Sequence, residues 1–355
     1  MLFIFWQNIV SPHHSFFLRN LASKHSVLLI VEKLVDEDRL NQGWELPNLG
    51  QVEILVLKYI SSSRMTEIFN LDAHHLFSGI LSYPSISIYF KKLIKTRKVS
   101  IISESPIQIG LMKFLRFSKY KFLAYKYNKH ISNIFAMGDL GVKWFERSGF
   151  SKGKIHRFMY TVELQNDVFI RDLYIKENEM IRFTYIGQII NRKGISELIG
   201  SLHKIGDCNW TLNIIGDGSE REKLIKLIHL YNLESKVFFR GVISNTDATK
   251  YLLTSTDYLI LPSRFDGWGA VVNESLACGV PAIVSNMCGS ASLITSNSWG
   301  YIYKQGDACQ LSDIIERLVK DKCQLNVESR LILAQNYEMI QAQVIDAFIS
   351  KFEKL

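Results

Sequence analysis

Hydrophobic and polar positions along the C-terminal half of the chain alternate between short apolar runs and segments of helical spacing. The apolar runs predict strands at residues 182–187, 211–216, 237–239, 258–261 and 282–285. The helical spacing predicts helices at residues 195–204, after Ser219, and at 270–278. Gly279 suits the C-cap of the last helix, and Pro281 prevents its continuation. Strands that alternate with helices in this way predict a parallel sheet covered on both faces.

The N-terminal half shows a weaker version of the same rhythm. Its apolar runs predict strands at residues 2–6, 27–31, 52–57, 75–77, 99–103 and 131–136. Helices are expected at residues 83–95 and 107–125, and a further helix at 331–352. The run at residues 1–6 lacks a positively charged segment and a cleavage site, so we interpret it as a buried strand rather than a signal peptide. No run approaches the 18 or so apolar residues that span a membrane.

The length of 355 residues and the two series of elements predict two domains. We expect an N-terminal domain at residues 1–165, a C-terminal domain at 166–330, and a final segment at 331–355 whose helix packs back toward the first domain. Open α/β sheets bind ligands outside the carboxyl ends of their strands, so we expect an interdomain binding cleft. The five cysteines all lie in the second half without a C-x-x-C pair, which favours a reducing compartment over a disulfide framework or a zinc site.

The formal net charge of +8 is unevenly distributed. Residues 1–165 carry 22 basic and 12 acidic residues, a net of +10, whereas the remainder carries 20 and 22, a net of −2. The basic residues concentrate at 91–98 and at 113–129, and the second stretch is interleaved with six aromatic residues. Three interpretations remain open: a solvated helix face, a surface that docks on anionic lipid, or a nucleic-acid surface. The last has no nucleic-acid-binding motif beside it, so we expect no nucleic-acid partner.

The segment from Leu261 to Glu274 (L-P-S-R-F-D-G-W-G-A-V-V-N-E) is the most informative in the chain. It passes from a strand end through a loop into a helix start, where free N–H groups attract negative charge. Gly267 and Gly269 would let the backbone approach a ligand closely. Asp266 and Glu274 could both accept hydrogen bonds from sugar hydroxyls. Alternatively, Asp266 caps the loop and Glu274 is a surface acid.

This segment resembles the retaining glycosyltransferases of family 4, which have the two-domain GT-B fold. Their signature is an acidic residue, seven intervening residues and a Glu. The sequence of this segment is similar to that of bacterial polysaccharide-assembly enzymes. The resemblance implies that Asp266, which stands where many members have Glu, contacts the transferred sugar. It implies that Glu274 contacts the donor ribose and that Gly267, Trp268 and Gly269 belong to the donor site.

Three further segments carry the resemblance through the C-terminal half. The first is G-Q-I-I-N-R-K-G, from Gly187, where many members have Arg in place of Gln188. We therefore assign the donor diphosphate to Arg192 and Lys193, as catalytic residues together with Asp266, because fixed cations stabilise a departing diphosphate. An exposed pair at a helix start is the alternative. The other two segments contain Gly216 with Gly218 and Arg240 with Gly241, and they resemble the strand ends near the nucleotide.

The resemblance of the N-terminal half is looser. Segments around residues 6–14, 75–79 and 103–106 are similar to acceptor-side loops of the polysaccharide subset. They make the following residues acceptor-side candidates: His13, His14, His75, Ser78 and Glu104. Strand-end capping or core hydrogen bonding is the alternative for these polar residues.

The resemblance implies a retaining hexosyltransferase that works in cell-surface polysaccharide assembly. We expect a nucleotide-diphosphate sugar as donor, a saccharide or polyprenyl-linked saccharide as acceptor, and no required metal or other cofactor. The basic aromatic surface predicts a cytoplasmic protein that is peripheral on the anionic inner face of the cytoplasmic membrane. A nucleotide-sugar 2-epimerase of related fold and a non-catalytic nucleotide-sugar-binding protein remain alternatives.

Overall fold

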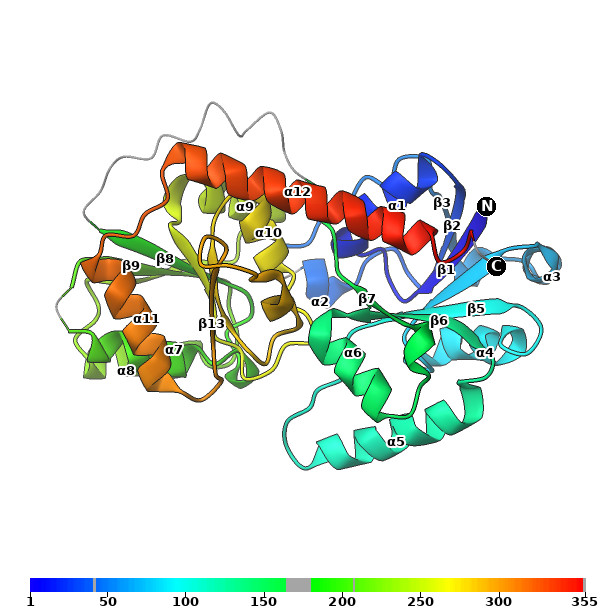
Figure 1. The fold of residues 1–355 in the computed structure, drawn as a ribbon, viewed down its shortest axis with the longest axis horizontal. Helices are drawn as coiled ribbons and strands as arrows, with labels where there is room; N and C mark the ends of the chain where they lie inside the picture. The colour runs from blue at the N-terminus through cyan, green and yellow to red at the C-terminus, as the bar shows by residue number, and fades with distance from the viewer. Residues whose placement is uncertain (41–42, 164–179, 207, 354–355) are drawn as a thin grey trace. The chain divides into compact units, whose positions relative to one another are not determined.

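The computed structural model describes residues 1–40, 43–163, 180–206 and 208–353, which form two compact units (Figure 1). Unit 1 comprises Met1–Leu40, Glu45–Val162 and Ala342–Leu355, as far as these residues are described. Unit 2 comprises Glu163–Gln341 and the short segment Asn41–Trp44, with the same restriction. The domain boundary predicted between residues 165 and 166 lies outside the described residues.

Unit 1 is built on a parallel sheet of seven described strands in the order β3-β2-β1-β4-β5-β6-β7. The strands are β1 (Leu2–Gln7), β2 (Ser26–Val31), β3 (Glu53–Val56), β4 (His74–Ser78), β5 (Lys98–Ser103), β6 (Ile131–Met137) and β7 (Ile155–Phe158). The first six confirm the apolar runs of the sequence to within two residues at each end. We did not predict β7, which is an edge strand with two adjacent polar residues between two apolar ones.

The helices of unit 1 cover both faces of this sheet. They are α1 (Pro12–Ala22), α2 (Glu37–Leu40), α3 (Ser62–Asn70), α4 (Pro84–Leu93), α5 (Met112–Tyr127) and α6 (Gly138–Arg147), with short 3₁₀ helices η1 (Leu57–Tyr59) and η2 (Lys152–Lys154). On one face, Phe17 of α1 meets Phe348 at 4.9 Å between ring centroids. Phe348 belongs to the last helix of the chain, α12 (Val327–Ile349), and lies 4.5 Å from Phe135 of β6. The end of this helix therefore belongs to the core of unit 1.

Unit 2 has a second parallel sheet, with six described strands in the order β10-β9-β8-β11-β12-β13. The strands are β8 (Ile181–Ile186), β9 (Trp210–Ile215), β10 (Val237–Gly241), β11 (Tyr258–Leu261), β12 (Ala282–Ser285) and β13 (Gly300–Tyr303). The helices are α7 (Ile195–Lys204), α8 (Arg221–Leu230), α9 (Asn245–Ser255), α10 (Val271–Ala277), α11 (Ala308–Lys320) and the first part of α12, with η3 (Asn191–Lys193) and η4 (Gly289–Leu293). Only β13, again an edge strand, was missed among these strands.

The strand order places a switch point in each sheet. In unit 2, β8 pairs with β9 on one side and with β11 on the other, so the connections after β8 and β11 leave in opposite directions. In unit 1, β1 occupies the same position between β2 and β4. Because ligands of such sheets bind where the connections diverge, the loops after β8, β11 and β1 are the places to examine.

Two helix starts differ from the prediction. The helix expected at residues 107–125 begins only at Met112, because Gly110 adopts a left-handed conformation with φ 73° that a helix cannot contain. The helix expected from residue 331 begins at Val327. Its first turns contain Arg330, which is 3% exposed, so the buried face there is polar and escapes a search for apolar periodicity.

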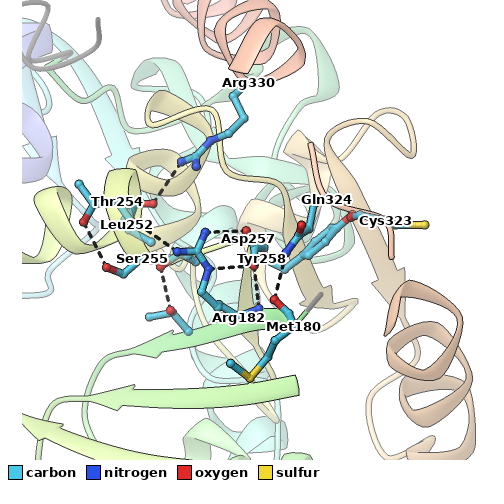
Figure 2. A network of polar contacts seen from close by, with 12 residues as sticks. Met180, Arg182, Leu252, Thr254, Ser255, Asp257, Tyr258, Cys323, Gln324 and Arg330 are labelled. Atoms are coloured by element: carbon cyan, nitrogen blue, oxygen red, sulfur yellow. Dashed lines mark hydrogen bonds and ion pairs between the residues drawn. The ribbon is translucent and has the colours of Figure 1, made fainter. Parts of the chain in front are cut away.

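Buried polar contacts fix the start of α12 to unit 2 (Figure 2). Arg330 donates from Nη2 to the carbonyl oxygens of Leu252 and Cys278, at 3.2 and 3.3 Å. Nearby, Arg182 and Asp257 form an ion pair at 2.9 Å, and the side chain of Asp257 is 4% exposed. Burial lowers the pKa of Arg330 to about 10, so this residue stays charged at neutral pH and its carbonyl partners compensate its desolvation.

Candidate active site

The loops after β8 and β11 meet at the switch point of the unit 2 sheet. The backbone N–H of Arg264 donates to the carbonyl oxygen of Arg192 at 2.9 Å, which ties the loop after β11 to η3. Gly194 has φ 69°, and a Cβ at this position would collide with the carbonyl oxygen of Pro262. Glycine is therefore needed at residue 194 for the two loops to approach each other.

Asp266 lies between two cations that η3 supplies. Lys193 Nζ donates to Asp266 Oδ2 at 2.5 Å, and Arg192 Nη1 lies 3.9 Å from Asp266 Oδ1. The side chains of Lys193 and Asp266 are 14% and 13% exposed, so this pair is largely removed from water. Arg192 also donates to the carbonyl oxygen of Phe265 at 2.9 Å. The structure thus brings together the three residues predicted to be catalytic, with two cations around one carboxylate.

The glycines predicted to line the donor site lie at adjacent strand ends. Gly187 follows β8 and Gly216 follows β9, and a Cβ on Gly216 would collide with the carbonyl oxygen of Gly187. A Cβ on Gly218 would likewise collide with the carbonyl oxygen of Ile189. Gly241 ends β10, and its carbonyl oxygen accepts from the N–H of Gly216 at 2.7 Å. The three strand ends are therefore packed backbone to backbone.

Arg240 stands beside these turns on the edge strand β10. Its Nε donates to Asn213 Oδ1 at 2.8 Å, and its guanidinium lies 5.3 Å from the ring centroid of Phe238. The residue is exposed, so these two contacts orient a charge that remains accessible. This arrangement is compatible with the predicted position near the nucleotide.

The loop from Gly267 to Gly269 is anchored by one large side chain. Trp268 is 1% exposed, and its indole N–H donates to Asn273 Oδ1 at 2.5 Å. Because the indole is buried and engaged, a donor contact from Trp268 would have to come from its backbone. Glu274 follows in α10, where burial raises the pKa of its carboxyl to about 7.

A second group of polar residues lies at the strand ends of unit 1. Tyr160, just after β7, donates from its hydroxyl to Glu104 Oε1 at 2.7 Å. The rings of His13 and His14, at the start of α1, lie 5.5 and 5.0 Å from the ring of Tyr160. His14 Nδ1 lies 2.7 Å from Gln7 Nε2, and burial lowers the pKa of His14 to about 3, so this ring is neutral. We call Gln7, His13, His14, Glu104 and Tyr160 the Tyr160 cluster.

The other two acceptor-side candidates lie elsewhere in β4. His75 is fully buried, its Nδ1 accepts from the indole N–H of Trp6 at 3.2 Å, and burial lowers its pKa to about 4. This contact is a hydrogen bond in the core, which was the alternative to an acceptor-side role for His75. Ser78 is the last residue of β4, at the carboxyl edge of the sheet.

Sequence reasoning missed Tyr160 and Asn273. Tyr160 lies two residues after the edge strand β7, and the buried apolar residues Phe158 and Met159 before it are the signal that could have marked a strand end there. Asn273 lies one residue before Glu274 and gave no signal, because its importance comes from a buried hydrogen bond to Trp268.

Residues 169–338 match the model of the family described as glycosyl transferases group 1. The matched stretch includes Lys193, Asp266 and Glu274. This part of the chain is therefore similar to the group 1 glycosyl transferases.

Two curated relatives match over less than half of the chain. The chain is 29% identical over 149 residues to N-acetyl-alpha-D-glucosaminyl L-malate synthase of Bacillus anthracis, an alignment that covers 42% of the chain and 38% of that relative. It is 24% identical over 175 residues to lipopolysaccharide 1,6-galactosyltransferase of Escherichia coli K12, with 48% of each chain covered. The chain thus spans less than half the length of both relatives.

Among solved structures, Anabaena Alr3699/HepE in complex with UDP matches with a TM-score of 0.72 at 15% identity, over 100% of both chains. At this identity the likeness shows the fold alone. The fold is the predicted pair of Rossmann-like parallel sheets of the GT-B class.

The described residues were compared with the requirements of a metal site and of a membrane-spanning helix. No group of three or more His, Cys, Asp or Glu side chains there could hold a metal ion. Within the same residues, no helix combines the length and the apolarity that crossing a bilayer requires.

Proposed function

We propose that the chain is a glycosyltransferase that moves a hexosyl-type sugar from a nucleotide-diphosphate sugar held by unit 2 to a saccharide or lipid-linked saccharide held by unit 1. The observation that carries this proposal is the ion pair between Lys193 and Asp266, with Arg192 beside it, at the switch point of a group 1 glycosyl transferase domain. A carboxylate that can accept from sugar hydroxyls stands next to two cations that can hold a diphosphate. UDP, which is bound in the Anabaena structure, is the first nucleotide to test.

In the proposed reaction, the bond between the anomeric carbon and the donor phosphate oxygen breaks. A bond from the anomeric carbon to the acceptor oxygen forms on the same face, so the anomeric configuration is retained. The acceptor hydroxyl proton passes to the departing phosphate oxygen. Lys193 and Arg192 stabilise the charge that develops on the leaving diphosphate, while Asp266 contacts the transferred sugar and Glu274 the ribose. No step in this route calls for a metal ion.

The Tyr160 cluster supports the placement of the acceptor in unit 1. It lies next to β1, the switch strand of that sheet, and its hydroxyl, amide, carboxylate and imidazole groups are the types that bind sugar hydroxyls. The neutral ring of His14 can form a hydrogen bond with the side-chain amide of Gln7 without carrying charge. We assign the acceptor hydroxyl to this cluster rather than to His75, because His75 is buried against Trp6.

Helix α5 supports a lipid-linked acceptor. Tyr120, Leu123, Ala124 and Tyr127 face the core, yet the opposite side of the same helix is also apolar. That side, with the N-cap residue before the helix, carries exposed apolar residues on both sides of Ser118, which recur at helical spacing and which we call the α5 surface: Leu111, Phe114, Leu115, Phe122 and Tyr125. Leu111 and Tyr125 are 87% and 89% exposed, a degree of apolar exposure that is typical of an interaction site.

Basic residues flank the α5 surface on both sides. By helical spacing, Lys119 and Lys126 lie along one edge and Lys121 along the other. Lys126 Nζ lies 6.0 Å from the ring centroid of Phe122 and 5.3 Å from that of Tyr127, which places its charge at the rim of the apolar stripe. An apolar stripe with basic rims is the pattern of a helix that lies in the interface of an anionic bilayer. This pattern supports our proposal that the protein binds peripherally to the inner face of the cytoplasmic membrane.

The test of the proposed function is a donor screen with the purified full chain. Candidate UDP-sugars are incubated with membrane lipid extract that contains polyprenyl-linked saccharides, and products are identified by mass and by linkage. Transfer to acceptor supports the proposal. Conversion of donor to its epimer without acceptor indicates the epimerase instead, and binding without turnover indicates a non-catalytic protein.

A further inference from the structure

Helix α12 contributes residues to both units. Its residues up to Gln341 belong to unit 2, and those from Ala342 onward belong to unit 1. In unit 2 its buried side contains three residues with polar groups beside Leu333 and Ala334: Arg330, Tyr337 and Gln341 are 3%, 0% and 1% exposed. These residues are seven and four positions apart, which places them on one side of the helix. Burying polar groups costs free energy unless they are hydrogen-bonded, so this side of the helix requires specific partners.

The partner of Tyr337 leads to the loop that contains Gly267 and Gly269. Trp268 can only donate from its indole nitrogen, so the Asn273 atom 2.5 Å away is the amide oxygen. This orientation directs Asn273 Nδ2 to the hydroxyl oxygen of Tyr337, which accepts at 2.6 Å. All three side chains are at most 1% exposed. The result is a buried chain of two hydrogen bonds with only one possible polarity.

Trp268 transmits this constraint to the loop backbone. Its own carbonyl oxygen accepts from the N–H of Ser290 at 2.8 Å, so both its side chain and its backbone are held. A Cβ on Gly269 would lie 3.7 Å from Asp266 Oδ2, which places this backbone beside the proposed sugar-binding carboxylate. A small rotation of the Trp268 indole would therefore move backbone that lies next to Asp266.

We propose that Tyr337 is a positioning residue for the loop Gly267–Gly269, acting through Asn273 and Trp268. The hydroxyl oxygen of Tyr337 fixes the Asn273 amide, the amide fixes the indole of Trp268, and the indole fixes the loop. The consequence for ligand binding rests on the proposed function, whereas the consequence for loop order does not.

The first test compares Tyr337→Phe with Tyr258→Phe in the full chain. Tyr258 is the matched control, because its side chain is 4% exposed and its hydroxyl also donates a hydrogen bond in unit 2, to the carbonyl oxygen of Cys323 at 2.6 Å (Figure 2). We expect Tyr337→Phe to weaken UDP binding about tenfold by calorimetry, equivalent to roughly 1.4 kcal/mol, and Tyr258→Phe to leave it unchanged. Equal UDP affinity in the wild type and Tyr337→Phe would overturn the proposal.

A double-mutant cycle tests the route. Trp268→Phe removes the indole donor, so adding Tyr337→Phe to it should weaken UDP binding by less than twofold more. If the two effects instead multiply, Tyr337 does not act through Trp268.

Amide hydrogen exchange measures the order of the loop Gly267–Gly269 in the absence of any ligand. Peptides that span residues 263–271 should exchange faster in Tyr337→Phe than in the wild type or in Tyr258→Phe. If wild-type protein does not bind UDP but this difference is seen, the proposed donor is wrong and the positioning role stands. If the three proteins exchange alike, the positioning role is wrong, whatever the donor.

Discussion

Lys193 and Asp266 form the ion pair on which the proposed donor site depends, and replacing Lys193 by methionine separates its role in turnover from its role in the fold. Methionine keeps much of the length and apolar volume of lysine but removes the ammonium that lies 2.5 Å from Asp266 Oδ2. Arg192, whose Nη1 lies 3.9 Å from Asp266 Oδ1, then remains to compensate the carboxylate. Two effects follow, and their magnitudes differ.

For turnover, a fixed electrostatic donor to a developing charge is worth about 10²–10³ in kcat, or roughly 3–4 kcal/mol. For stability, breaking a fully buried pair on one side costs about 3–5 kcal/mol. This pair is slightly exposed and retains Arg192, so we expect a loss of roughly 2 kcal/mol. The double variant Lys193→Met with Asp266→Asn removes both charges and should regain most of that stability without regaining turnover.

The assay follows UDP release from the donor identified in the screen, together with thermal unfolding of each variant. Lys223→Met is the matched control, because Lys223 also contacts a carboxylate in unit 2, Glu220 at 2.8 Å, but is 59% exposed. It should change neither quantity measurably, since exposed pairs contribute little. If Lys193→Met turns over within twofold of the wild type, the assignment of Lys193 is refuted.

The remaining predictions concern pH, membrane and backbone. Burial raises the folded-state pKa of Glu274 from 4.5 to about 7. The free energy of unfolding of the wild type, relative to that of Glu274→Gln, should therefore be highest below pH 4.5 and fall by about 3 kcal/mol as the pH rises through 7. Urea unfolding at several pH values measures this difference. Phe122→Glu should reduce sedimentation with phosphatidylglycerol vesicles at low salt by at least fivefold without changing the melting temperature, because Phe122 is 60% exposed; unchanged sedimentation would remove the α5 surface from the account. Gly216→Ala should destabilise the protein by roughly 2 kcal/mol or more, because the new Cβ would meet the carbonyl oxygen of Gly187. Gly200→Ala should stabilise it by about 0.5–1 kcal/mol, because Gly200 lies inside α7 with open space around it. The reverse order of melting temperatures would contradict this geometry.

The core strands of both sheets were predictable because parallel strands covered on both faces are continuous apolar runs. Residues 258–261 and 282–285 are fully buried, and their predicted bounds match the structure. The edge strands β7 and β13 were missed, although the edge strands β3 and β10 were predicted from their apolar residues. In β7 the sequence I-H-R-F places two polar residues together between two apolar ones, which interrupts an apolar run.

The charged part of the candidate site was also predictable, because Lys193 and Asp266 lie in segments that resemble a known family. Their direct contact was not predictable, since it depends on the loops after β8 and β11 meeting at the switch point. Tyr160 and Tyr337 left no trace in the sequence pattern. Their partners, Glu104 and Asn273, are 56 and 64 residues away, and hydrogen bonds across such separations leave no local periodicity.

The central claim is that this chain transfers a sugar from a nucleotide donor with retention of configuration. The most direct measurement is the anomeric configuration of the product, determined by NMR after reaction of the full chain with the donor and acceptor found in the screen. The account predicts a glycosidic bond with the same anomeric configuration as the donor, and no product from Lys193→Met above about one hundredth of the wild-type rate. A product of inverted configuration, or a donor that is consumed only as its epimer, would contradict it.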